Sequence, residues 1–121
     1  MSAVVAAVGA KKTGFRISPF TNTEGTKTDK ANLEDTFLYV TRELKTRDPE
    51  LAYLHVIEPR SNGDIDVTPG EGENIDFIAK LWAPKVLLVA GGHKEEDAER
   101  VARDYQNAVA VYGRHFISNV S

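Results

Sequence analysis

The sequence predicts an α/β fold with a parallel sheet, and three observations support this fold class. Short apolar segments alternate along the chain with stretches of helical periodicity, which is the pattern of parallel α/β proteins. Two of the apolar segments, Leu51–Ile57 and Lys85–Ala90, are almost continuously apolar, as strands covered on both faces are. The long connections Pro19–Ala31 and Glu58–Asn74 each follow the carboxyl end of a strand, where such proteins place their functional residues.

The predicted elements begin with the end of a helix at Ser2–Gly9, which Gly9 closes near its carboxyl end. Strands and helices then alternate, and a short turn follows the last strand. The four strands are predicted at Thr13–Ser18, Leu51–Ile57, Lys85–Ala90 and Ala108–Tyr112.

Three helices are predicted between these strands, at Asn32–Arg47, Ile75–Trp82 and Lys94–Tyr105. The first spaces its apolar residues three and four apart, with Asn32 as its N-cap and Pro49 beyond its end. The third carries acidic residues early and arginines late, an order that complements the helix dipole.

Composition limits the function classes that the chain can serve. Its 121 residues, 41% of them hydrophobic, suffice for one domain and are too few for two. The formal charge of −3 and the mixed distribution of basic and acidic residues make nucleic acid an unexpected partner. There is no cysteine, no signal-peptide pattern and no apolar run of membrane-spanning length, so we expect a soluble, cytoplasmic protein.

Length leaves two architectures open. A closed barrel of eight parallel strands usually needs about 250 residues, whereas this chain supplies about four strand–helix units. The chain is therefore either a small open sheet or half of a barrel.

Two neighbouring strand ends carry residues that suit a phosphate group. The third strand ends in Gly91-Gly92 and the fourth in Gly113-Arg114. Glycines at a strand end let the backbone approach a ligand, and arginine adds charge-assisted hydrogen bonds to phosphate oxygens. The alternative is that these glycines form ordinary turns.

Four segments in the same order resemble landmarks of the old yellow enzyme family of FMN-dependent ene-reductases. They cover nearly the whole chain: Gly14–Phe20 (GFRISPF), Leu51–Arg60 (LAYLHVIEPR), Val89–Gly92 (VAGG) and Tyr112–Asn119 (YGRHFISN). The resemblance implies a single partial domain, residues 1–121, forming the C-terminal half of a (β/α)8 TIM barrel, about strands five to eight, with flanking helices.

The resemblance also implies roles for individual residues. Arg16 corresponds to an arginine beside the pyrimidine side of the flavin ring; the alternative is a surface or salt-bridged arginine. Gly91, Gly92, Gly113 and Arg114 match the residues that hold the FMN phosphate. Gly92 stands where some relatives have asparagine, so a side-chain contact is missing there while the backbone N–H remains.

Old yellow enzymes reduce FMN with NADPH and pass hydride from the flavin to an activated alkene, which the resemblance implies for the complete protein. Their substrate clamp and proton donor lie on earlier strands, so we assign no catalytic residue in this chain. Val120 and Ser121 depart from the family pattern, which suggests truncation or a divergent end. We expect a second copy or a complementary N-terminal half as partner; the alternative is a non-catalytic remnant or phosphate-binding module.

Several other polar residues have structural interpretations. Glu58 and Arg60 are expected to form an ion pair or to brace a turn, and His55 to be a hydrogen-bonded core histidine. His93 and His115 adjoin the phosphate region without metal-ligand spacing. The acidic segment with Asp64, Asp66, Glu71 and Glu73 does not fit a calcium loop and is expected to be solvated, so no metal site is predicted.

Overall fold

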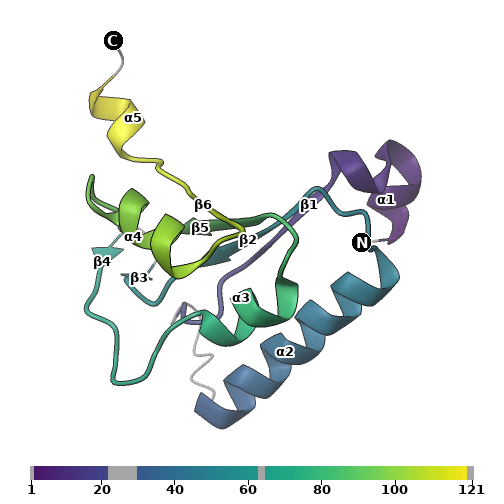
Figure 1. The fold of residues 1–121 in the computed structure, drawn as a ribbon, viewed down its shortest axis with the longest axis horizontal. Helices are drawn as coiled ribbons and strands as arrows, with labels where there is room; N and C mark the ends of the chain where they lie inside the picture. The colour runs from purple at the N-terminus through teal and green to yellow at the C-terminus, as the bar shows by residue number, and fades with distance from the viewer. Residues whose placement is uncertain (1, 22–29, 63–64, 120–121) are drawn as a thin grey trace.

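The computed structural model describes residues 2–21, 30–62 and 65–119. A four-stranded sheet lies at its centre, with its strands side by side in the order β1 (Gly14–Ile17), β2 (Tyr53–Ile57), β5 (Leu87–Ala90) and β6 (Ala108–Ala110) (Figure 1). All three pairings are parallel, which confirms the predicted parallel sheet. The carboxyl ends of the strands therefore meet at one edge, which we call the carboxyl edge of the sheet.

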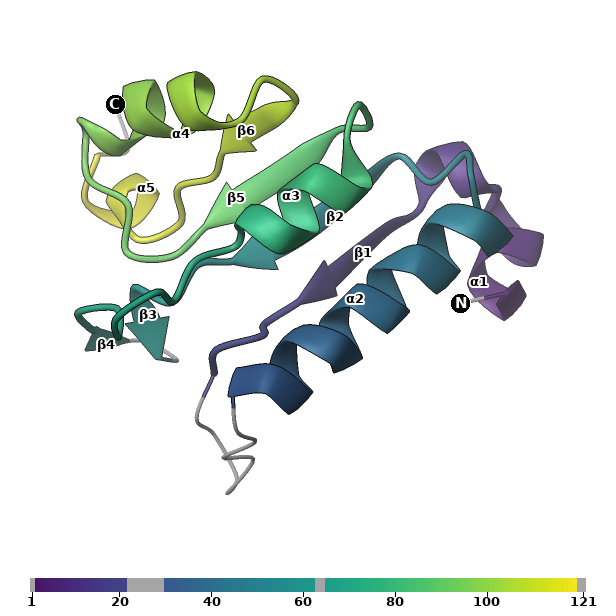
Figure 2. The same cartoon turned by 60° about the horizontal axis from the view of Figure 1, so that its bottom comes forward.

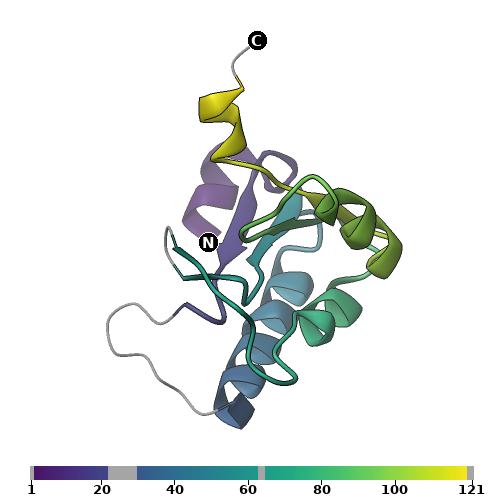
Figure 3. The ribbon, with the colours of Figure 1, turned by 90° about the vertical axis from the view of Figure 1, so that its left-hand side faces the viewer.

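Helices connect consecutive strands of this sheet: α2 (Lys30–Arg47), α3 (Asp76–Trp82) and α4 (Asp97–Asp104). Figures 2 and 3 show α2 and α3 on the same side of the sheet. The short α1 (Ser2–Val8) and a 3₁₀ turn, η1 (Ala10–Lys12), precede β1, and α5 (His115–Ser118) follows β6 and extends away from the sheet (Figure 1). None of the helices in the described residues combines the length and the apolar composition needed to cross a membrane.

Two predicted helix starts are wrong. Asn32 is not an N-cap, because α2 begins at Lys30 and the Asn32 carbonyl already accepts a hydrogen bond from Thr36 Oγ1 at 2.7 Å. Residues 30 and 31 are good helix formers, so the helix extends beyond the polar residue that looked like its cap. α4 starts later than predicted, because the Asp97 side chain accepts a hydrogen bond from the Lys94 backbone N–H at 2.7 Å and closes a turn before the helix.

The hydrophobic core lies between the sheet and the helices. Trp82, at the end of α3, is fully buried and donates a hydrogen bond from Nε1 to the Val86 carbonyl at 2.9 Å. The apolar stripe predicted for α2 is confirmed, since Leu44 belongs to the core while Phe37 and Val40 pack against it. Burial of apolar side chains against the sheet is the main stabilisation available to these short helices.

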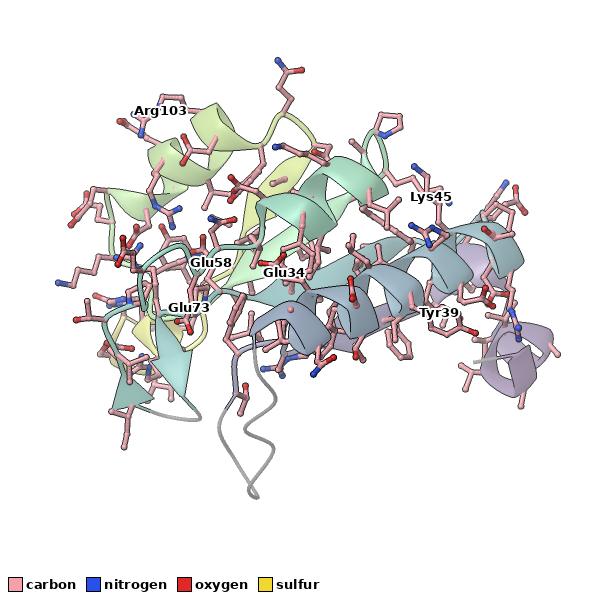
Figure 4. The ribbon with its side chains drawn as sticks, turned by 90° about the horizontal axis from the view of Figure 1, so that it is seen from below. Glu34, Tyr39, Lys45, Glu58, Glu73 and Arg103 are labelled. Atoms are coloured by element: carbon pink, nitrogen blue, oxygen red, sulfur yellow. The ribbon has the colours of Figure 1, made fainter. Side chains whose placement is uncertain are left out.

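A lysine joins α2 to the carboxyl end of α3. Lys45 of α2 donates hydrogen bonds from Nζ to the carbonyls of Leu81 and Ala83, both at 2.8 Å. Figure 4 shows Lys45 reaching from α2 towards the end of α3. The ammonium group thus satisfies carbonyls at a helix carboxyl end, where a cation also suits the helix dipole.

The two faces of the sheet are covered to different extents. Leu54, Val56, Leu87 and Val89 are fully buried and point to one side, which we call the covered face. The residues between them in β2 and β5, His55 and Leu88, are only half-buried, and Val109 of β6 is 54% exposed; they lie on the other side, the open face. The prediction of strands covered on both faces is therefore wrong for the described residues, because their connecting helices pack on one side only.

A second, two-stranded sheet was not predicted. β3 (Ser61–Asn62) and β4 (Ile65–Asp66) pair antiparallel directly after β2, within the segment expected to be a solvated acidic loop. The Val67 backbone N–H also donates to the Arg60 carbonyl at 2.9 Å. This hairpin therefore returns to the end of β2 and lies at the carboxyl edge of the sheet (Figure 2).

Candidate functional site

A pocket of about 770 Å³ opens at the carboxyl edge of the sheet. Its walls come from the ends of all four strands of the main sheet and from the β3–β4 hairpin. All five predicted site residues line it: Arg16, Gly91, Gly92, Gly113 and Arg114. The chain thus brings together, from three separate strand ends, residues that the sequence places up to 98 positions apart.

Arg16 lies on the open face near the end of β1, beside His55 of β2 in the strand register. Its side chain is exposed, and within the described part of the chain no carboxylate forms an ion pair with it. The salt-bridged alternative considered for Arg16 is therefore not what these residues show. The guanidinium is a fixed positive charge in the wall of the pocket.

His55 is not the hydrogen-bonded core histidine that was expected. Its Nε2 is buried and has no hydrogen-bond partner in the described residues, and the side chain lines the pocket. Burial, reinforced by the nearby positive charge of Arg16, lowers the pKa of His55 below its ordinary value. The pocket lining therefore includes an imidazole whose buried Nε2 has no hydrogen-bond partner among the described residues.

The two glycines after β5 have backbone conformations that L-residues with side chains rarely adopt, with φ of +129° at Gly91 and +58° at Gly92. A Cβ at Gly91 would lie 3.2 Å from both the backbone nitrogen and the carbonyl oxygen of Glu58. The segment therefore needs glycine for its path and packs closely against the end of β2.

A cluster of buried charges supports this segment from the covered side. Glu58 accepts hydrogen bonds from His93 Nε2 at 2.8 Å and from Arg100 Nη2 at 2.7 Å. Burial alone would raise the pKa of Glu58, but the hydrogen bonds from His93 and Arg100 outweigh it and hold that pKa below its ordinary value. Figure 4 shows Glu58 between the hairpin and the helices.

Asp97 completes the cluster by accepting hydrogen bonds from Arg60 and Arg100. Burial opposes ionisation, yet the Lys94 backbone N–H and the two arginines keep the pKa of Asp97 well below its ordinary value. Glu58 and Arg60 both form ion pairs, as expected, but with Arg100 and Asp97 respectively and not with each other in the described residues. His93, which was expected to adjoin the phosphate region, lines the pocket and is 5% exposed.

Two hydrogen bonds join the segment after β5 to the segment after β6. Tyr112 donates from its hydroxyl to the Lys94 carbonyl at 2.8 Å, and His115 Nε2 donates to the His93 carbonyl at 3.0 Å. The rings of His93 and Tyr112 also meet edge to face, with centroids 5.8 Å apart. The glycine pair and the Gly113–Arg114 pair are therefore held close together in the lining of one pocket.

Arg114 forms an ion pair with Asp66 of β4. Asp66 was expected to belong to a solvated loop. Its side chain is solvent-exposed as expected, but the residue belongs to a strand of the hairpin, and its carboxylate lies in the pocket wall. The dipeptide Asn62-Gly63 is a sequence signal for a hairpin turn and could have revealed this arrangement.

Some sequence-based expectations fall outside the described residues. These are Asp64 of the acidic segment, most of the connection at 19–31, and the divergent end at Val120 and Ser121. Among residues 2–21, 30–62 and 65–119, no group of three or more histidine or carboxylate side chains is arranged to hold a metal ion.

Fold and pocket together define a class of protein. It is an α/β protein with a parallel sheet, and the carboxyl edge of this sheet, where such folds place their binding sites, carries a glycine pair and an arginine on adjacent strand ends. The comparison with known proteins makes the class specific. The model of the NADH:flavin oxidoreductase / NADH oxidase family matches residues 1–121, and the chain belongs to this family. FMN is the cofactor of the family, and NAD(P)H is its reductant.

Individual relatives agree with this assignment. A putative NADPH dehydrogenase of Schizosaccharomyces pombe is 31% identical over 98% of this chain and 30% of its own length. A protein of Claviceps fusiformis named as a probable inactive dehydrogenase is 30% identical over 96% of this chain and 31% of its own length.

The structural comparison supports the same fold. The old yellow enzyme from Pichia sp. AKU4542 superposes with a TM-score of 0.74 at 25% identity, covering 98% of this chain and 29% of that one. The chain thus spans about three tenths of the length of the relatives that it matches, and its sheet corresponds to a fragment of their barrel.

Proposed function

We propose that this chain is the FMN-phosphate-binding portion of an NAD(P)H-dependent flavin oxidoreductase that reduces activated alkenes. Its 121 residues form one partial domain, corresponding to about strands five to eight of a (β/α)8 barrel. One observation carries the proposal: five residues matched to the FMN site by family resemblance converge on a single pocket from three strand ends.

The residues present fit the two ends of a flavin mononucleotide. Gly91 and Gly92 offer a backbone that a ligand can approach closely, and a Cβ at Gly113 would meet nothing within 4 Å, so space is open there. Arg114 provides a cation for the phosphate. Arg16 lies on the open face, where it would contact the flavin ring, and the side chain of His55 lies beside it in the pocket lining.

When bound, FMN would supply hydride transfer, from NAD(P)H to the flavin and from the flavin to the alkene. The role of this chain is to hold the cofactor: Arg114 and the glycine pair anchor the phosphate, and Arg16 places a positive charge beside the ring. A positive charge there favours negative charge on the reduced flavin.

Substrate binding and proton donation require residues that the resemblance assigns to other strands of the barrel. We therefore propose that activity needs completion by a second copy of the chain or by a complementary N-terminal half. The half-buried side chains of the open face support this, because in a closed barrel they would face the interior. The compartment that we propose is the cytoplasm.

Titration of the purified chain with FMN and, separately, with riboflavin tests the proposal. FMN is expected to change its absorption and fluorescence on binding and to bind more tightly than riboflavin, which lacks the phosphate. Replacement of Arg114 by alanine should remove this preference for FMN. No spectral change and no thermal shift with FMN would refute flavin binding by this chain. NADPH oxidation with an enone is measured separately, with and without a complementary half.

A second candidate function is a phosphate-binding module without catalysis. The relative named as a probable inactive dehydrogenase favours it, since that protein matches nearly the whole of this chain. This candidate predicts FMN binding that is unaffected by NADPH, and no enone reduction after the barrel is completed.

A further inference from the structure

We propose that Asp66 is a built-in competitor for the phosphate subsite, with its carboxylate lying where an oxygen of the bound phosphate would go. The inference rests on the proposed function, because it concerns the same anion. It adds a regulatory element that the family resemblance does not assign: an internal anion that the ligand must displace.

The position of the Asp66 carboxylate carries the inference. Its Oδ1 accepts the hydrogen bond of Arg114 Nη2. The same oxygen lies 2.7 Å from the place that a Cβ of Gly92 would occupy, and the carboxyl carbon lies 3.2 Å from it. One carboxylate oxygen therefore sits between the glycine pair of one loop and the arginine of the other, which are the two walls proposed to hold phosphate.

Backbone pairing positions the residue that carries this carboxylate. Asp66 is paired with Ser61 in the antiparallel ladder, and the next residue, Val67, donates its backbone N–H to the Arg60 carbonyl. Arg60 is in turn fixed to Asp97 of the buried charge cluster. Asp66 is thus connected to the end of β2, and its approach to Arg114 is set by the fold of this segment.

Carboxylate and phosphate compete because each is an anionic acceptor for the same guanidinium. A phosphate monoester placed beside Asp66 would also experience repulsion between like charges. Asp66 and Arg114 are 54% and 57% exposed at their side chains, so the pair is accessible to an incoming anion and is weak in water. Phosphate binding should therefore displace Asp66, and the lost ion pair should weaken the affinity for phosphate.

The test measures binding of FMN and riboflavin to the intact chain and to the variant Asp66→Asn. Removing the competing charge should tighten FMN binding by roughly two- to fivefold, the range that an exposed ion pair allows, and leave riboflavin binding unchanged. The gain should shrink at high salt, where exposed charges are screened. Inorganic phosphate, titrated alone by calorimetry, should likewise bind the variant more tightly than the unaltered chain.

Glu71→Gln is the matched control, since it removes one carboxylate from an exposed position on the following segment and leaves the pocket lining intact. Asp66→Ala is the second variant, and circular dichroism of all the variants verifies their fold. Equal tightening by Glu71→Gln would overturn the inference in favour of net charge.

Weaker FMN binding by both folded Asp66 variants would also overturn it, because Asp66 would then hold Arg114 in place for the ligand. In that case the proposed function survives if Arg114→Ala still abolishes the preference for FMN. If the proposed function itself is wrong, the binding measurements give a different result: neither the unaltered chain nor Asp66→Asn would bind FMN more tightly than riboflavin.

Discussion

The covered and open faces of the sheet are built from the same four strands but have different surroundings. On the covered face, Leu54, Val56, Leu87 and Val89 are sealed beneath the connecting helices. On the open face, the intervening residues are half-buried or exposed, and they include Arg16 and His55. The difference separates two tasks: one face stabilises the fold of this chain, and the other carries its candidate chemistry.

The largest expected effect comes from truncating neighbouring leucines of β5 that point to opposite faces. Leu87→Ala, on the covered face, should lower the free energy of unfolding by about 2–5 kcal/mol, because it leaves a cavity. Leu88→Ala, on the open face, should lower it by about 1 kcal/mol or less. Urea denaturation measures both values. Equal, concentration-dependent losses would instead show that a second copy covers the open face.

Substitution in the buried charge cluster tests whether the cluster stabilises the end of the covered face nearest the pocket. Glu58→Gln should lower the free energy of unfolding by about 1.5–3 kcal/mol, since it removes a charged acceptor from His93 and Arg100. Glu71→Gln, at an exposed position, should change it by less than about 0.5 kcal/mol. A loss for Glu58→Gln no larger than the loss for this control would contradict the supporting role of the cluster.

Substitution of Gly92 tests the backbone conformation at the carboxyl edge of the sheet. Gly92→Ala should destabilise by about 1–2 kcal/mol, because φ is +58° and the new Cβ would press on Asp66 and the Arg60 carbonyl. Gly92→Asn should be milder in backbone strain, since asparagine tolerates this region better. Thermal unfolding of the three proteins gives the order, and an alanine variant as stable as the glycine form would contradict it.

The smallest expected effect is a pH dependence that arises on the open face. Because the pKa of His55 is lowered in the folded chain, the unfolded chain binds the proton more readily. Stability should therefore fall as pH drops below about 6.5 towards the lowered pKa, and it should be retained above that range. His55→Gln should flatten this part of the profile of melting temperature against pH. An unchanged slope would assign the effect to other groups.

The sequence predicted the strands and their parallel pairing well, because alternation and apolar runs depend on local burial. The prediction that helices cover both faces of the sheet was wrong. An apolar run indicates that a face is suited to burial, but it does not indicate which chain buries that face. The start of α2 was missed at Asn32, where helix propensity extended the helix past a polar residue.

For the candidate site, the sequence indicated Arg16, the glycines and Arg114 from motifs at strand ends, and the structure brings them to one pocket. The interpretation missed Asp66, although Asn62-Gly63 is a hairpin signal, and it missed the absence of a described partner for His55 Nε2, which depends on spatial neighbours. Asp66 contacts Arg114 only because the hairpin folds back to the carboxyl edge of the sheet. His55 was expected to be buried because its strand is apolar, but no described helix covers its face of the sheet.

The strand order β1-β2-β5-β6 has a consequence for how the chain folds. Each strand of the main sheet pairs with the strand that immediately precedes it there, so every new pairing closes a single strand–helix unit. Loop closure of this size carries a modest entropy penalty, and contacts between successive units favour rapid folding. The sheet can thus form by adding one strand–helix unit at a time.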